Sequence, residues 1–147
     1  MKQGFVKVAS ATPRIRVADP VYNAQVICEQ AKEAAEHGAK IVVFPELCIT
    51  GYTCNDLFLQ ELLLEKAKEA LLTIAEETGQ LETLFLVGLP VDKDGRLYNV
   101  AAVLYRGRIL GMIPKKNIPM YAEFYEGRHF TPGEETVTEY LCFILTL

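Results

Sequence analysis

The sequence lacks the features that mark several large classes of protein. No segment of its 147 residues approaches the roughly 20 consecutive apolar residues that a membrane-spanning helix needs. There is no surplus of positive charge either, since 15 Lys and Arg face 19 Asp and Glu, for a formal net charge of −4. A protein that binds phosphate backbones or anionic lipid usually has the opposite balance. These absences argue against a membrane protein and against nucleic acid as a partner.

Cysteine is sparse and shows no pattern of close pairs. The four cysteines stand at positions 28, 48, 54 and 142, and the five residues between Cys48 and Cys54 are not a usual zinc spacing. Four cysteines in 147 residues also fall short of the density of a secreted, disulfide-linked domain. No glycine-rich phosphate-binding loop occurs. We therefore expect a reduced, cytoplasmic protein, with no metal or cofactor bound by this part of the chain.

The pattern that is present alternates strands with helices. Asp19-Pro20 is a typical helix start, with aspartate as the N-cap and proline at the first helical position, and Gly38 is a typical end. A second amphipathic helix is expected at 61–78. Strands are expected at 5–9, 41–44 and 84–89, and the continuous apolar run 41–44 predicts a strand covered on both faces.

Two turn signals follow the last of these strands. Residues 92–96 and 106–108 are polar and rich in glycine, and each separates two apolar segments, so they predict hairpins with return strands at 99–104 and 109–113. Strand–helix–strand–helix followed by hairpins predicts one α/β domain with a mixed sheet.

Glu46 is the first candidate for chemistry. It follows an expected strand and Pro45, at the position where α/β sheets often carry working residues. Between Phe44 and Leu47 its carboxylate should be partly desolvated, which favours a general base. Taken alone, however, a glutamate at a strand end is more often a surface or capping residue.

Lys115 and Lys116 form the second candidate, again at a strand end and beside a proline. A lysine held near a carboxylate can stabilise a developing oxyanion. The alternative is an exposed pair of charges that protects the sheet edge from aggregation, and spacing alone does not say which lysine points inward.

The third candidate is the segment Tyr121–Glu126, which mixes aromatic residues with two carboxylates. Arg128, which follows it, pairs with Glu123 or Glu126 in the ordinary structural reading. His129 reads as a packed or capping imidazole rather than a catalytic one.

Taken together, these segments resemble the nitrilase, or carbon-nitrogen hydrolase, superfamily. The segment 44–52 (FPELCITGY) is similar to the one that supplies the family's catalytic glutamate, and 106–115 (RGRILGMIPK) to the strands that lead to its catalytic lysine. The resemblance implies that Glu46 and Lys115 are catalytic and that Glu123 is the supporting glutamate. It also implies a nitrilase-type αββα sandwich, of which this chain would be a part, with two helices on one face of a mixed sheet.

The segment after the lysine suggests the branch. Residues 118–126 followed by Arg128-His129-Phe130 are similar to the glutaminase domain of glutamine-dependent NAD+ synthetases. In that branch a cysteine thiolate attacks the side-chain amide of glutamine, and Tyr52 and Tyr121 would shape the glutamine pocket. A separate synthetase domain, which uses ATP and Mg²⁺, would use the ammonia to convert deamido-NAD+ to NAD+, and the parent enzyme is expected to be a homo-oligomer.

The same resemblance places the nucleophilic cysteine well downstream of the lysine, in a context that none of the four cysteines matches. Residues 140–147 are almost entirely apolar, as in an interior strand of a longer domain or in out-of-register sequence. We therefore expect residues 1–147 to be the N-terminal part of a glutaminase domain, without the nucleophile-bearing segment and the synthetase domain, and inactive alone. The alternatives are another nitrilase-type amidase or carbamoylase, or a non-catalytic fragment or interaction module.

Overall fold

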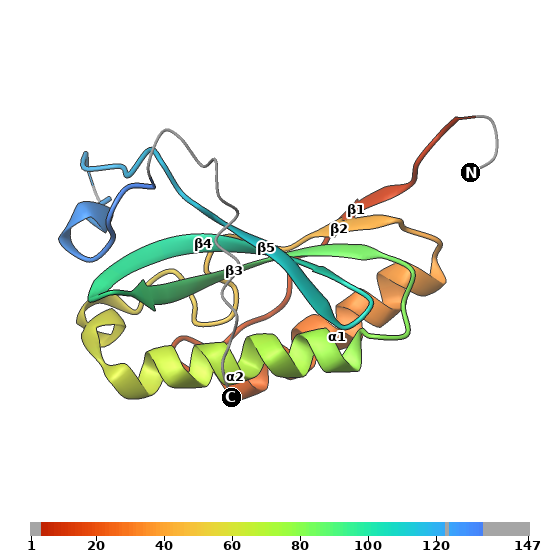
Figure 1. The fold of residues 1–147 in the computed structure, drawn as a ribbon, viewed down its shortest axis with the longest axis horizontal. Helices are drawn as coiled ribbons and strands as arrows, with labels where there is room; N and C mark the ends of the chain where they lie inside the picture. The colour runs from red at the N-terminus through yellow and green to blue at the C-terminus, as the bar shows by residue number, and fades with distance from the viewer. Residues whose placement is uncertain (1–3, 123, 134–147) are drawn as a thin grey trace.

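The computed structural model describes residues 4–122 and 124–133, which form a mixed sheet with two helices against one of its faces (Figure 1). The five strands lie in the order β1-β2-β3-β4-β5. The first three are parallel to one another and the last three are antiparallel. The predicted α/β class, the mixed sheet and the placement of both helices on one face are confirmed. The strands are β1 (Val8–Ser10), β2 (Ile41–Val43), β3 (Leu84–Lys93), β4 (Arg96–Tyr105) and β5 (Arg108–Pro114).

The helices are α1 (Pro20–Glu36) and α2 (Glu61–Glu77), close to their predicted bounds. Asp19 caps α1 as expected, because its carboxylate accepts a hydrogen bond from the Tyr22 backbone N–H at 3.1 Å. Ile27 of α1 and Ile74 of α2 are fully buried in the core between helices and sheet. Among the described residues, no helix has the length and apolarity to cross a membrane.

The two hairpins form as predicted but with longer strands. Asp94 and Gly95 have φ of 53° and 73°, and Arg106 and Gly107 have φ of 48° and 75°. Two consecutive residues with positive φ make the tight turns whose twist matches that of the flanking strands. β3 therefore continues past its apolar part to Lys93, where the sequence predicted an end at residue 89.

The two faces of the sheet differ in how well they are covered. Side chains alternate between the faces along each strand. Val42 and Val87 point toward the helices and are fully buried, whereas Val43 and Ile113 are 44% and 58% exposed on the other face. The prediction that strand 41–44 is covered on both faces is therefore wrong within the described part of the chain. An apolar run indicates a strand, but it does not show what packs on each side.

A second, smaller apolar cluster lies at the end of the sheet. It joins the loop after β2, the short 3-10 helix η1 (Asn55–Leu59), the start of α2 and the segment just after a second short 3-10 helix, η2 (Glu126–Arg128), to β4. This cluster brings segments that are distant in sequence to one place, where most of the candidate site residues lie. Its buried members are Leu47, Cys54, Phe58, Leu63, Leu97 and Phe130.

Candidate active site

Glu46 stands in a tight turn that follows β2. The turn closes where the Gly51 backbone N–H donates to the Leu47 carbonyl oxygen at 2.7 Å, and Leu47 itself has a φ of 51°. Leu47 is fully buried, whereas 41% of the Glu46 side chain is exposed. The buried Leu47 thus anchors the turn, and Glu46 beside it remains accessible from solvent. The side chain of Glu46 is thus partly buried, as its position between Phe44 and Leu47 predicted.

The turn can lie directly on the sheet because β3 has a glycine beneath it. The Gly88 carbonyl oxygen accepts a hydrogen bond from the Ile49 backbone N–H at 3.1 Å. A β-carbon at Gly88 would overlap the backbone nitrogen of Leu47 and would lie 2.8 Å from the Pro45 carbonyl oxygen. The position of Glu46 therefore depends on the absence of a side chain at residue 88.

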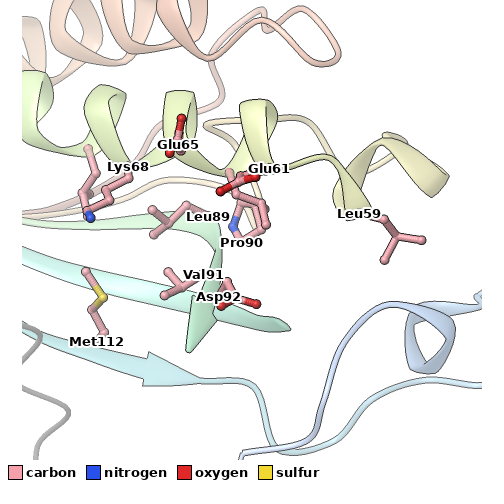
Figure 2. Close-up of a pocket in the computed structure, with 11 residues that line it drawn as sticks. Leu59, Glu61, Glu65, Lys68, Leu89, Pro90, Val91, Asp92 and Met112 are labelled. Atoms are coloured by element: carbon pink, nitrogen blue, oxygen red, sulfur yellow. The ribbon is translucent and has the colours of Figure 1, made fainter. Parts of the chain in front are cut away.

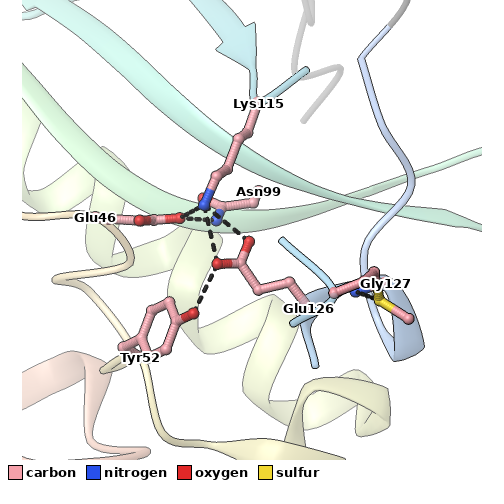
Figure 3. Close-up of polar contacts among 7 residues, drawn as sticks. Glu46, Tyr52, Asn99, Lys115, Glu126 and Gly127 are labelled. Carbon is pink, nitrogen blue, oxygen red and sulfur yellow. Dashed lines mark hydrogen bonds and ion pairs between the residues drawn. The ribbon is translucent and has the colours of Figure 1, made fainter. Parts of the chain in front are cut away.

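Lys115 reaches the same place from the end of β5. Its backbone N–H donates to the Asn99 carbonyl oxygen at 2.8 Å, and its carbonyl oxygen accepts from the Gly133 N–H at 2.9 Å. Its Nζ lies 2.7 Å from Oε1 of Glu46, although the two residues are 69 positions apart (Figure 3). The two residues that the sequence placed at separate strand ends thus form one ion pair.

Glu126, at the start of η2, is a second carboxylate for the same lysine. Both of its oxygens lie 2.9 Å from the Nζ of Lys115, and only 6% of its side chain is exposed. The Tyr52 hydroxyl donates to Oε1 of Glu126 at 2.7 Å (Figure 3). Tyr52 therefore belongs to the site through Glu126.

Asn99 of β4 completes the set of polar residues. Its side-chain Nδ2 donates to Oε1 of Glu46, the same oxygen that binds Lys115 (Figure 3). Sequence reasoning missed Asn99, which reads as an ordinary residue of a return strand. The sequence feature that could have identified Asn99 is a polar residue between apolar ones in a strand that has neighbours on both sides.

The environment keeps Lys115 positively charged. Partial burial by itself lowers the pKa of Lys115, but the hydrogen bonds and charges of Glu46 and Glu126 outweigh that effect and raise it above its ordinary value. An amine with a raised pKa is a poor proton acceptor at neutral pH and a good fixed cation. Lys115 is therefore suited to stabilising negative charge.

The remaining predicted residues have different outcomes. Tyr121 is 69% exposed and its ring packs edge-on against Phe124, with 5.6 Å between ring centroids. Its role in a glutamine pocket stays a prediction. Glu123 lies outside the described residues, so its role as the supporting glutamate also stays a prediction. In the described part of the chain, Glu126 is the carboxylate that supports Lys115.

Within the described residues Arg128 pairs with Asp56 and not with Glu126, one of the two carboxylates that the sequence offered; the other, Glu123, lies outside those residues. Nη2 of Arg128 lies 3.2 Å from Oδ2 of Asp56 on η1, and Nε2 of His129 lies 3.1 Å from Oδ1 of the same aspartate. These contacts connect η2 to η1. Glu126 is consequently left to bind Lys115 and Tyr52.

A groove on the open face of the sheet leads to the ion pair. It has a volume of 360 Å³ and is lined by Glu46, Asn99 and Lys115 together with apolar residues of β2 to β5. A larger groove of 470 Å³ lies on the helix side, between α2 and β3 (Figure 2). Its charged residues, among them Glu61 and Lys68, do not include any member of the ion pair. The groove on the open face is therefore the candidate active site.

The described cysteines are poor candidates for a nucleophile. Cys28, Cys48 and Cys54 are all buried. Burial raises the pKa of the Cys28 and Cys48 thiols to about 11, and it also raises that of Cys54. Because the thiolate is the reactive form, none of these three thiols is activated.

The Lys115–Glu126 contact predicts an energetic coupling. Lys115→Met should leave the buried Glu126 carboxylate without its cation, and Glu126→Gln should remove that cost, so a double-mutant cycle should give a coupling of about 1–2 kcal/mol. Urea unfolding of the two single variants and the double variant measures it. A parallel cycle with Glu123→Gln tests the alternative, because a larger coupling there would show that Glu123 supports the lysine.

Comparisons with known proteins agree with this geometry. The profile of the carbon-nitrogen hydrolase family matches residues 7–142. The glutamine-dependent NAD(+) synthetase of Mycobacterium bovis is 40% identical over 133 residues, covering 90% of this chain and 20% of that protein. The corresponding synthetase of Acinetobacter baylyi is 36% identical over 142 residues, covering 96% of this chain and 26% of that protein.

Solved structures show the same relationship. The crystal structure of a glutamine-dependent NAD(+) synthetase from Cytophaga hutchinsonii superposes with a TM-score of 0.83 and 30% identity, covering 88% of this chain and 22% of that one. An amidase from Nesterenkonia sp. superposes with a TM-score of 0.72 and 25% identity, covering 88% of this chain and 49% of that one. The chain thus spans about a fifth to a quarter of the synthetases it matches. With the family profile matched over most of its length and the Glu46–Lys115 pair in place, the chain belongs to the carbon-nitrogen hydrolase family.

Proposed function

We propose that this chain supplies the general base and the oxyanion-stabilising cation of a glutaminase. In the full-length protein that carries it, the ammonia released from glutamine would serve the ATP-dependent conversion of deamido-NAD+ to NAD+. The observation that carries the proposal is the 2.7 Å ion pair between Glu46 and Lys115 at the end of an open groove. The similarity to glutamine-dependent NAD(+) synthetases supports the choice of substrate.

The proposed chemistry assigns one task to each charged group. Glu46 takes the proton of a cysteine thiol as the thiolate attacks the amide carbon of glutamine, and then passes that proton to the departing ammonia. The ammonium of Lys115 stabilises the negative oxygen of the tetrahedral intermediate, an effect usually worth about 3 kcal/mol. Glu126 and Tyr52 hold Lys115 in position. Water then hydrolyses the thioester and releases glutamate.

The nucleophile in this proposal is not one of the three described cysteines, because their thiols are buried and have raised pKa values. It would come from another segment of the glutaminase domain, while ATP and Mg²⁺ would bind to the synthetase domain. A reduced, cytoplasmic setting fits the three free thiols.

The proposal predicts that glutamine hydrolysis needs more than this chain. We expect the full-length protein to release ammonia from glutamine and the 147-residue chain to release none above the uncatalysed rate. A coupled ammonia assay on both proteins measures this. Turnover by the short chain that Cys48→Ala abolishes would contradict the proposed origin of the nucleophile. No glutamine hydrolysis by the full-length protein would contradict the proposed substrate.

A further inference from the structure

Asn99 touches both halves of the ion pair from a third strand. Its side-chain Nδ2 donates to Oε1 of Glu46, and its backbone carbonyl accepts from the N–H of Lys115 at 2.8 Å. Glu46 comes from the loop after β2 and Lys115 from the end of β5. Asn99 is therefore the residue through which β4 connects the two loops that carry the charges.

The surroundings of Asn99 make this contact rigid. Asn99 is 4% exposed and lies within the β3–β4 ladder, where it pairs with Pro90. A carboxylate only accepts hydrogen bonds, so the amide must present its NH₂ end to Glu46. A buried donor of this kind restricts the side chain that it binds, since breaking the bond would leave the amide without its partner.

The type of residue at position 99 also matters for the charge of the site. Glu46 and Glu126 together carry two negative charges against the single positive charge of Lys115. Aspartate at position 99 would add a third carboxylate, which in its ionised form cannot donate to Glu46. A neutral amide supplies a donor to Glu46 without changing this balance, so Lys115 keeps both of its carboxylate partners.

On the basis of the proposed glutaminase function, we infer that Asn99 is a positioning residue for the reaction. By holding Oε1 of Glu46 beside Nζ of Lys115, it orients the rest of the carboxylate toward the groove, where the thiol proton would be collected. Misplacing a catalytic group by about 1 Å commonly costs on the order of 100-fold in rate. Loss of the Asn99 donor should therefore reduce kcat rather than substrate binding.

Two near-isosteric variants separate the hydrogen bond from the packing. Asn99→Leu keeps the branched shape and removes the donor, and Asn99→Asp keeps the size and replaces the donor NH₂ with an acceptor oxygen. Asn23→Ala is the control, since Asn23 is also a buried asparagine but its amide donates to the carbonyls of Arg16 and Ile49, away from the ion pair.

The first readout uses the 147-residue chain and needs no activity. In the NMR spectrum, the two γ-methylene protons of Glu46 should have separate resonances in the wild-type chain and in Asn23→Ala. They should collapse toward one averaged signal in both Asn99 variants. The second readout uses the full-length protein, where kcat for glutamine should fall about 100-fold in Asn99→Leu with little change in KM.

The outcomes separate this inference from the proposed function. Unchanged Glu46 resonances in both folded Asn99 variants would overturn the positioning role, as would an unchanged kcat. Collapsed resonances together with a wild-type protein that hydrolyses no glutamine would leave the positioning of Glu46 standing and refute the proposed reaction. Collapsed resonances with a lower kcat and a retained KM support both.

Discussion

Glu46→Gln and Lys115→Ala should each lower glutamine-dependent NAD+ synthesis by the full-length protein about 100- to 1,000-fold, while synthesis from free ammonia continues at the wild-type rate. Glutamine at position 46 keeps the size of the side chain and can still accept from Asn99, but it cannot take a proton from a thiol. Alanine at position 115 removes the cation that would face the developing oxyanion. Because external ammonia bypasses amide hydrolysis, both variants should use it normally.

The measurement is NAD+ formation from deamido-NAD+ and ATP, with glutamine or ammonium chloride as the nitrogen source. Lys116→Ala and Glu82→Gln serve as matched controls. The first changes the adjacent lysine, and the second changes a surface glutamate paired with Arg106. Both should retain the glutamine-dependent rate. If the Glu46 and Lys115 variants lose both activities, the ion pair holds the structure together and its assignment as catalytic machinery is wrong.

The main elements of the fold were predictable because their signals are local. Asp19 and Gly38 set the limits of α1 through backbone geometry that depends on a few neighbouring residues. Strand length was less predictable. β3 runs on to Lys93 because β4 pairs with it residue by residue, and this pairing is a property of two segments rather than one. Coverage of the sheet was not predictable from strand composition at all, as the exposed Val43 shows.

The candidate site divides in the same way. Glu46 and Lys115 could be identified because each lies in a continuous motif that resembles a known family. Glu126 and Asn99 could not be assigned, because their contribution is a distance to another segment, and a single sequence contains no distances. Glu126 belongs to the same recognised motif as Glu123, and its contact with Lys115 adds a second carboxylate to the one that the resemblance named. The side chain that bonds to a lysine from a loop depends on how that loop is anchored, here through Asp56 and the buried Phe130.

Gly88→Ala should lower the free energy of unfolding by about 3 kcal/mol, against the usual trend for glycine in a strand. Replacing a strand glycine by alanine normally stabilises a protein by about 0.5–1 kcal/mol, since the unfolded chain loses conformational freedom. Here the new β-carbon would overlap the Leu47 nitrogen and would lie 2.8 Å and 3.0 Å from backbone atoms of Pro45 and Glu46. These are backbone atoms of a turn anchored by a buried leucine, so they cannot move aside as a flexible side chain would.

Urea unfolding of the 147-residue chain measures the loss, and Gly95→Ala is the control. Gly95 has a φ of 73° with no atom within 4 Å of the added carbon, so alanine there costs only the left-handed backbone strain, about 1 kcal/mol. The Gly88 variant should also separate Glu46 from Lys115, because the turn has to lift from β3 to make room. The nuclear Overhauser contact between the two side chains would then be lost. A Gly88→Ala chain that is as stable as the wild type and keeps this contact would contradict the prediction. It would mean that the turn does not rest on β3 and that the position of Glu46 does not depend on the missing side chain at residue 88.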